Sequence, residues 1–262
     1  MGRPVVLLGC GRLGSAIAEG WLKTGAVAAS DLIILSPSVK PTMEAAQAAG
    51  ARINPPLETL AQARALVIAV KPAKWREATA PLLDHLADDA AVVSVMAGVP
   101  TGAMSAVFGD RDLVRVMPTT GVARAQGAAI LWAERSGGWD LGRALFGPMA
   151  ELFDLHSEDQ MDAATALVGA GPAYFYAFTL TLAQAGAAAG LDAEVAERMA
   201  RATLRAASGG LGDESLAEAI NRVASPGGVT RAGLDVLEAG GLLPTAVEAI
   251  RAAVARSREM SS

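Results

Sequence analysis

Residues 5–14 read VVLLGCGRLG, and this stretch decides the fold. Four apolar residues suited to a buried strand run directly into Gly9-x-Gly11-x-x-Gly14. A helix-compatible segment, SAIAEGWLKTG, follows at once. The pattern predicts a strand, a tight turn and the start of a helix. Gly9 would permit the tight turn. Gly11 would allow the backbone to approach a pyrophosphate closely, and Gly14 would allow the helix to pack closely on the strand.

This glycine turn predicts a dinucleotide site, because the unpaired N–H groups and the dipole at a helix N-terminus favour an anion. Arg12 and Leu13, between Gly11 and Gly14, join the three glycines as candidate cofactor-binding residues. The simpler interpretation is that the glycines only permit a tight connection between strand and helix. Cys10, at a variable position of the motif, is interpreted as a small buried filler rather than a nucleophile.

Length, charge and composition limit the classes of function. The chain has 262 residues, enough for one large or two modest domains. A net charge of −5 argues against a nucleic-acid or anionic-membrane surface. No apolar run approaches the length of a membrane span, and no leader precedes the first strand, so we expect a soluble cytoplasmic protein. One cysteine and two isolated histidines, His85 and His156, predict neither an internal disulfide nor a metal site.

Strand-like and helix-like segments alternate through the first part of the chain. This alternation predicts an α/β fold, a doubly wound Rossmann-type dinucleotide-binding domain over residues 1–157. Beyond the first strand, the apolar runs expected to form strands are 31–35, 65–70, 90–96, 113–117 and 128–132, and the main helix-compatible segments are 42–49 and 74–86.

After Ser157 the sequence lacks β-branched runs and is rich in alanine and leucine, which predicts an all-helical domain over residues 158–262. Asp192 resembles a helix cap, and residues 244–259 should form an amphipathic helix. Such an alanine-rich domain has a thin core, so we expect an obligate dimer formed through it. The expected breaks between helices lie at 169–172, 190–192, 208–212, 225–228 and 240–241.

The run 31–35 ends where a dinucleotide fold meets the adenosine ribose. Enzymes that prefer NAD place an acidic residue there, and its charge repels a 2′-phosphate. Asp31 lies at the wrong end of the run for this role. Ser36, Ser38 and Lys40 offer hydroxyls and a positive charge instead, which favours NADP(H), with NAD(H) as the alternative cofactor. The simpler interpretation is an ordinary polar turn.

Two further strand ends supply candidates for the cofactor site. The run 65–70 stops at Val70 and Lys71, before a proline, and Lys71 is placed to meet cofactor phosphate or ribose. A solvated lysine at a strand end is the alternative. After the run 90–96, the small residue Ala97 would let the backbone pass near a flat nicotinamide ring.

A second motif lies far from the first, at residues 225–230. Two glycines follow Ser-Pro and precede a hydroxyl, at the point where a helix would begin. Consecutive backbone N–H groups there suit a small carboxylate, although a plain loop between helices is the alternative. The candidate substrate-binding residues are Ser225, Pro226, Gly227, Gly228, Val229 and Thr230.

The chain resembles the pyrroline-5-carboxylate reductase family over essentially its full length. The last of the matching motifs is the most specific, whereas the glycine motif is shared with many folds. These motifs are VVLLGCGRLG at 5–14, AVKP at 69–72, AG at 97–98, RVMPTT at 115–120, GAGPAY at 169–174 and SPGGVTRAGLDVLEAGGL at 225–242.

The resemblance implies an oxidoreductase that reduces the cyclic imine of 1-pyrroline-5-carboxylate to L-proline with hydride from NAD(P)H. It implies that Thr230 is the catalytic hydroxyl bonded to the ring nitrogen and that the backbone of 226–229 holds the carboxylate. Ser36 would lie at the adenosine 2′ position, with Lys71 and Ala97 along the nicotinamide half. It also implies a homodimer, which in some family members assembles further.

The sequence departs from the family pattern at several positions, which leaves open a reductase of another cyclic imino acid. Thr119 and Gly121 replace residues of an Asn-Thr-Pro motif, and Pro56 stands where the family has an asparagine near the ribose. Ala170 replaces a serine, and Leu180 replaces a carboxylate one or two helical turns later.

Two other functions would fit part of this pattern. A β-hydroxyacid dehydrogenase shares the architecture but needs a lysine acid/base in its helical domain, and this chain has no lysine after Lys74. A non-catalytic regulator that binds NADP(H) would not need the second, carboxylate-binding loop that ends at Thr230.

Overall fold

The computed structural model describes residues 2–260. The chain divides into two compact units. One contains the residues up to Gly169 together with those from Ala253 onward, and the other is Ala170–Ala252.

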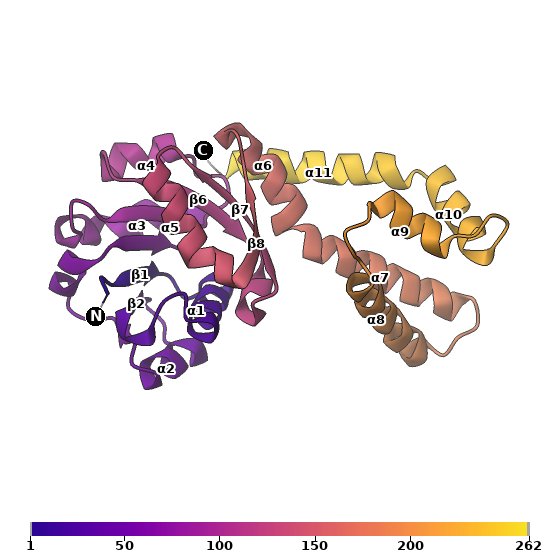
Figure 1. Ribbon diagram of the computed structural model, residues 1–262, viewed down its shortest axis with the longest axis horizontal. Coiled ribbons are helices and arrows are strands. Elements are labelled where there is room, and N and C mark those ends of the chain that lie inside the picture. Colours follow the sequence, from indigo (N-terminus) through magenta and orange to yellow (C-terminus); the bar gives the residue numbers. More distant parts are fainter. Residues whose placement is uncertain (1, 261–262) are drawn as a thin grey trace. The chain divides into compact units, whose positions relative to one another are not determined.

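An eight-stranded sheet forms the centre of the first unit (Figure 1). Its order is β3-β2-β1-β4-β5-β6-β7-β8, and every neighbouring pair is parallel except β6 with β7. This order and the helices around it confirm the predicted Rossmann-type α/β fold. The strands are β1 Val5–Leu8, β2 Leu32–Leu35, β3 Arg52–Ile53, β4 Ala65–Ile68, β5 Ala91–Ser94, β6 Leu113–Pro118, β7 Gly127–Ala133 and β8 Ala150–Asp154.

Strands β1, β2 and β4 are apolar at every position because both faces of the sheet are covered. In β1, Val5 and Leu7 join a core cluster that contains residues of α1, α2 and α5. Val6 and Leu8 join the opposite cluster, which contains residues of α3 and α4. All four side chains are buried, as expected for a parallel strand between two helical layers. These helices are α1 Arg12–Thr24, α2 Pro41–Ala48, α3 Trp75–Thr79, α4 Thr101–Phe108 and α5 Ser136–Phe146.

Some elements differ from the sequence prediction. The segment 74–86 is not one helix: α3 ends at Thr79, and a 3-10 helix continues over Ala80–His85. Pro81 explains this, since a proline inside an α-helix removes a hydrogen bond to the preceding turn. Strands β3 and β8 were not predicted.

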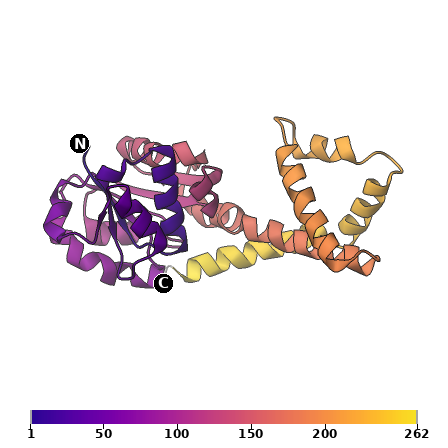
Figure 2. The same cartoon turned by 90° about the horizontal axis from the view of Figure 1, so that it is seen from below.

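The second unit contains no strand among its described residues, which confirms the prediction of a helical region (Figure 2). The side chain of Asp192 accepts a hydrogen bond from the N–H of Val195 at 3.0 Å, so its predicted role as a cap is confirmed. The helices are α7 Gly171–Ala188, α8 Ala193–Gly209, α9 Leu216–Val223, α10 Val229–Ala239 and α11 Leu242–Glu259, the last of which ends in the first unit.

The expected break at 169–172 is reduced to one bend residue, Ala170. Helix α6, Met161–Ala164, continues as a π-helical turn over Thr165–Gly169, and α7 begins at Gly171. Pro172 does not interrupt α7 because a proline is tolerated in the first turn of a helix. By length and composition alone, the combined run, Glu158–Ala188, is long and apolar enough to cross a membrane, and one such helix does not establish a membrane span.

Candidate functional site

The sheet register brings the candidate cofactor residues of the first unit to one edge. Leu8 at the end of β1 lies opposite Leu35 and Ile68, and Ile68 lies opposite Ser94. The segments that follow these strand ends carry Gly9, Ser36, Val70, Lys71 and Ala97. Since β1 lies between β2 and β4, this edge contains the switch in strand order where doubly wound sheets bind their ligands.

The three glycines of the turn have different surroundings. A Cβ on Gly9, whose φ is +98°, would lie 2.8 Å from the carbonyl oxygen of Ala69. A Cβ on Gly14 would overlap the carbonyl oxygen of Gly9. A Cβ on Gly11 would have no atom within 4 Å among the described residues. Gly9 and Gly14 are therefore required by the protein's own packing, whereas Gly11 borders open space.

The start of α1 fits a diphosphate. The helix begins at Arg12, and its N-cap residue, Gly11, supplies no side-chain hydrogen bond. The N–H groups of the first turn, to which Leu13 contributes, are left for an external acceptor. Arg12 is exposed and Leu13 is half-buried. Cys10 is buried, as predicted, and its sulfur lies 3.4 Å from the hydroxyl of Ser15.

At the end of β2, Ser36 is fixed by Asn54, which the sequence analysis missed. The amide oxygen of Asn54 accepts the N–H of Ser36 at 2.9 Å, and its Nδ2 donates to the Ser36 carbonyl, also at 2.9 Å. The Ser36 hydroxyl donates to the carbonyl of Ser38 at 3.2 Å. Asn54 has a φ of +44°, a conformation that asparagine tolerates better than most residues. An asparagine directly after Arg52-Ile53 and before Pro-Pro was the available signal.

The other two strand ends differ in exposure. Lys71 is exposed and Val70 is half-buried. Ala97 is half-buried and packs against a small core cluster formed by Met117, Ile130 and Met161. The side chain of Lys71 is thus free to meet an anion, and the backbone near Ala97 is held from behind.

In the second unit, the motif at 225–230 forms a tight turn and a helix start. The N–H of Gly228 donates to the carbonyl of Ser225 at 3.0 Å, and Gly227 has a φ of +71°. Helix α10 begins at Val229, the predicted position, and Gly228 as N-cap gives it no side-chain hydrogen bond. Thr230 is exposed, and among residues 2–260 its hydroxyl forms no hydrogen bond. The turn and the first turn of α10 thus present backbone and hydroxyl donors.

Charged groups around this motif stabilise its flanking helices. Arg231 donates to Glu238 and Asp235 on the same helix, and the hydrogen bond to Glu238, followed by that to Asp235, raises the pKa of Arg231. At the start of α9, Ser215 and Glu218 form a reciprocal capping box. The Ser215 hydroxyl donates to the Glu218 carboxylate, which lowers the pKa of Glu218.

Known proteins are similar to this chain over nearly its whole length. A family model described as NADP oxidoreductase coenzyme F420-dependent matches residues 4–98, and one described as pyrroline-5-carboxylate reductase dimerisation matches residues 158–260. The pyrroline-5-carboxylate reductase of Pisum sativum is 31% identical over 97% of this chain and 94% of its own length. That of Thermus thermophilus is 31% identical over 98% of both chains. The chain belongs to the pyrroline-5-carboxylate reductase family.

Solved structures of family members have the same fold. The pyrroline-5-carboxylate reductase of Coxiella burnetii has a TM-score of 0.90 at 26% identity over 100% of both chains. The Plasmodium falciparum pyrroline carboxylate reductase, solved with NADP bound, has a TM-score of 0.83 at 26% identity over 99% of this chain and 98% of its own. The similarity therefore includes both units.

The structure gives the surroundings of four positions at which the sequence is expected to depart from the family pattern. The Thr119 hydroxyl accepts the N–H of Ala128 at 3.1 Å, which extends the pairing of β6 with β7. A Cβ on Gly121 would lie 2.5 Å from the carbonyl oxygen of Gln126, so this turn requires glycine. Pro56 precedes a 3-10 helix, and Leu180 on α7 is exposed.

Proposed function

We propose that this protein is a pyrroline-5-carboxylate reductase, which reduces the C=N bond of 1-pyrroline-5-carboxylate to L-proline with NADP(H). The observation that carries the proposal is the full-length family match together with the two motifs. Residues 1–157 would bind the cofactor through the glycine turn, and residues 158–262 would bind the imino acid and form the dimer.

The proposed chemistry makes modest demands on the side chains. When bound, NADPH would supply a hydride to the imine carbon and become NADP+, so that the C=N bond of the protonated imine would become a C–N single bond. A protonated imine is already electrophilic, and positioning with charge complementarity can supply much of the barrier reduction. Thr230 would hold the ring nitrogen through its hydroxyl. The turn at 226–229 would hold the carboxylate through N–H groups not committed within the turn.

The test is a steady-state assay of pyrroline-5-carboxylate with NADPH and, separately, with NADH. We expect cofactor oxidation that depends on the imino acid and yields L-proline. A six-membered cyclic imino acid, assayed in parallel, tests the alternative substrate. Binding of NADPH without turnover of either imino acid would contradict the proposal and favour a regulator.

We expect NADPH to be preferred over NADH, and Ser36→Asp to reverse this preference by at least about tenfold. A carboxylate at this position would repel the 2′-phosphate and accept a hydrogen bond from the 2′-hydroxyl of NADH. The ratio of kcat/KM values for the two cofactors measures the change. Ser36→Asn is the control, because asparagine has nearly the same shape as aspartate but carries no charge. An unchanged ratio in Ser36→Asp would remove Ser36 from the site.

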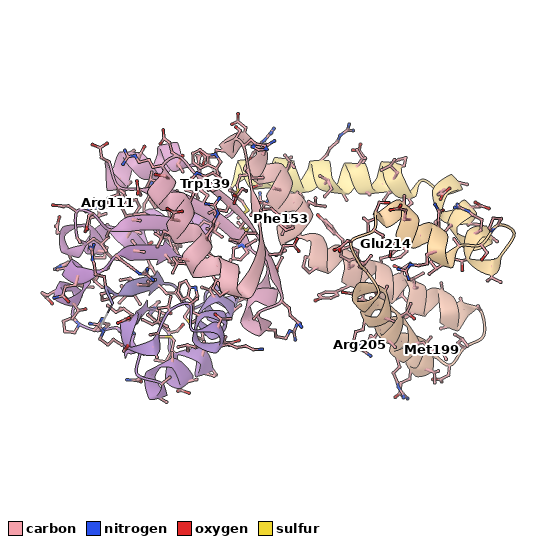
Figure 3. The ribbon with its side chains drawn as sticks, in the orientation of Figure 1. Arg111, Trp139, Phe153, Met199, Arg205 and Glu214 are labelled. Carbon is pink, nitrogen blue, oxygen red and sulfur yellow. The ribbon has the colours of Figure 1, made fainter. Side chains whose placement is uncertain are left out.

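We also propose a homodimer formed through the helical region. The match to a dimerisation domain supports it, and so does the surface of α7, where Phe175 and Tyr176 are 65% and 61% exposed. Apolar side chains such as Met199 on α8 are exposed too (Figure 3). A second copy that covers this surface would explain the apolar run Glu158–Ala188 without a membrane, in a soluble cytoplasmic enzyme.

Phe175→Asp is expected to convert the dimer into monomers at micromolar concentration, because a charge would be buried in the interface. Light scattering coupled to size-exclusion chromatography, without detergent, measures the mass. Val39→Asp, at an apolar residue of the first unit that is 61% exposed, is the matched control and should leave the mass unchanged. A Phe175→Asp protein that remains a dimer would contradict an interface at α7.

A further inference from the structure

A buried ion pair joins β6 to the start of the segment that matches the dimerisation domain. Arg115 on β6 is 5% exposed, and its Nη1 donates to Oε1 of Glu158 at 2.9 Å. The other terminal nitrogen of Arg115, Nη2, is buried and has no hydrogen-bond partner among residues 2–260. Within residues 2–260, Glu158 is the only anionic partner of this buried guanidinium, so its removal would be costly.

The same carboxylate caps helix α4. The N-cap residue of α4 is Pro100, which provides no side-chain hydrogen bond. Glu158 takes over this role, since its Oε1 accepts the N–H of Thr101 at 2.8 Å and its Oε2 accepts the Thr101 hydroxyl at 2.6 Å. A negative charge at a helix N-terminus is favoured by the helix dipole. Glu158 therefore fixes the start of α4 from 57 residues away in the sequence.

The segment that Glu158 fixes is the loop between β5 and α4. This loop contains Ala97 and Gly98, and Gly98 has a φ of +76°. Ala97 packs against the cluster that includes Met161, three residues after Glu158. The loop is thus held at its end by the carboxylate and from behind by the same short segment.

We propose that Glu158 is a positioning residue that sets the Ala97 loop for the nicotinamide half of the cofactor. This inference rests on the proposed function, because it assigns the loop to the reacting end of NADPH. Glu158 is not proposed to touch the substrate or the cofactor. Its effect comes through the loop, and hydride transfer is sensitive to displacements of about 1 Å in the parts that orient the reactants.

The experiment compares the full-length wild type with Glu158→Gln and Glu158→Ala in single-turnover reactions followed by NADPH fluorescence. The rate reports hydride transfer, and the amplitude reports the fraction of active sites. We expect the rate to fall about tenfold in Glu158→Gln and about 100-fold in Glu158→Ala, with amplitudes preserved. The Kd for NADPH should stay within about threefold, since the glycine turn is untouched.

Hydrogen–deuterium exchange without cofactor supplies an independent readout. In Glu158→Ala, amides of residues 97–104 should exchange faster, whereas those of β5 should not change. Asp154→Asn is the matched control, because Asp154 pairs with Arg143 at an exposed site and, among residues 2–260, forms no hydrogen bond or ion pair with the loop. It should leave both the rate and the exchange of 97–104 unchanged.

The outcomes separate the inference from the proposed function. A wild type that does not turn over the imino acid overturns the proposed function and the inference with it. The inference alone is overturned if the wild type turns over the imino acid and the Glu158→Ala variant has an unchanged rate. The same conclusion follows if the Glu158→Ala variant loses amplitude but not rate. If Glu158→Ala does not fold, Thr101→Val carries the test. It removes only the hydroxyl bond to Glu158 and should slow hydride transfer about threefold with its amplitude intact.

Discussion

Thr230→Val is expected to lower kcat/KM for pyrroline-5-carboxylate about 100-fold, whereas the Kd for NADPH stays within about twofold. Valine has nearly the shape of threonine, so α10 should still begin at Val229. What is lost is the hydroxyl, which forms no hydrogen bond within residues 2–260 and is therefore available to the ring nitrogen. Removal of one hydrogen-bonding group that orients a reacting atom can cost about 100-fold in rate. Steady-state kinetics and a fluorescence titration with NADPH measure the two effects.

Thr230→Ser is the matched control. It keeps the hydroxyl and removes only a methyl group, so most of the activity should return. A collapse of NADPH affinity in Thr230→Val, or equal losses in the valine and serine variants, would contradict the placement of the substrate at the 225–230 turn.

The strands that could be predicted from the sequence are those whose burial requires a run of apolar residues in the sequence. β1, β2 and β4 are covered on both faces, so each reads as a continuous apolar run. β3 leaves no such pattern, because Arg52 and Ile53 are only half-buried and form its whole length. In β8, Glu151 and Phe153 are both exposed, so the strand depends on pairing with β7 rather than on an apolar period.

The same contrast holds for the candidate site. The glycine turn was predicted because its three glycines lie within six residues of one another, so the motif can be recognised from a short stretch of sequence. The partner of Ser36 was not found, because Asn54 lies 18 residues further along and reads as an ordinary turn residue before two prolines. Arg115 and Glu158 are 43 residues apart, and only the folded sheet and the following helical segment bring them together.

The predicted break at 169–172 is present but shorter than expected, for a definable reason. Glycine and proline in one short stretch usually end a helix. Here Pro172 lies in the first turn of α7, where its missing N–H breaks no intrahelical bond, and a π-helical turn over Thr165–Gly169 precedes the bend. The sequence pattern contains no signal for a π-helical turn, so the near-continuity of the helical segments on either side of Ala170 was not predicted.

Gly11→Ala is expected to raise the Kd for NADPH at least about 100-fold while the free energy of unfolding without cofactor is unchanged or slightly higher. A methyl group at Gly11 would meet no protein atom within 4 Å, so the apo fold should accept it. The same methyl group would occupy the space where backbone and pyrophosphate must approach closely. Fluorescence titration gives the Kd, and urea denaturation gives the free energy of unfolding.

Substitutions at two other glycines serve as controls, which separate an effect on cofactor binding from an effect on folding. Gly14→Ala should lower the free energy of unfolding by several kcal/mol, about 3 or more, because its methyl group overlaps the Gly9 carbonyl and the backbone must move. Gly102→Ala adds a methyl group in open space within α4 and should leave NADPH affinity unchanged, with a gain in stability of about 0.5–1 kcal/mol. If Gly11→Ala instead behaved like Gly102→Ala, the open space beside Gly11 would not be the diphosphate site. The cofactor would then have to bind at the strand-end edge by contacts other than the glycine turn.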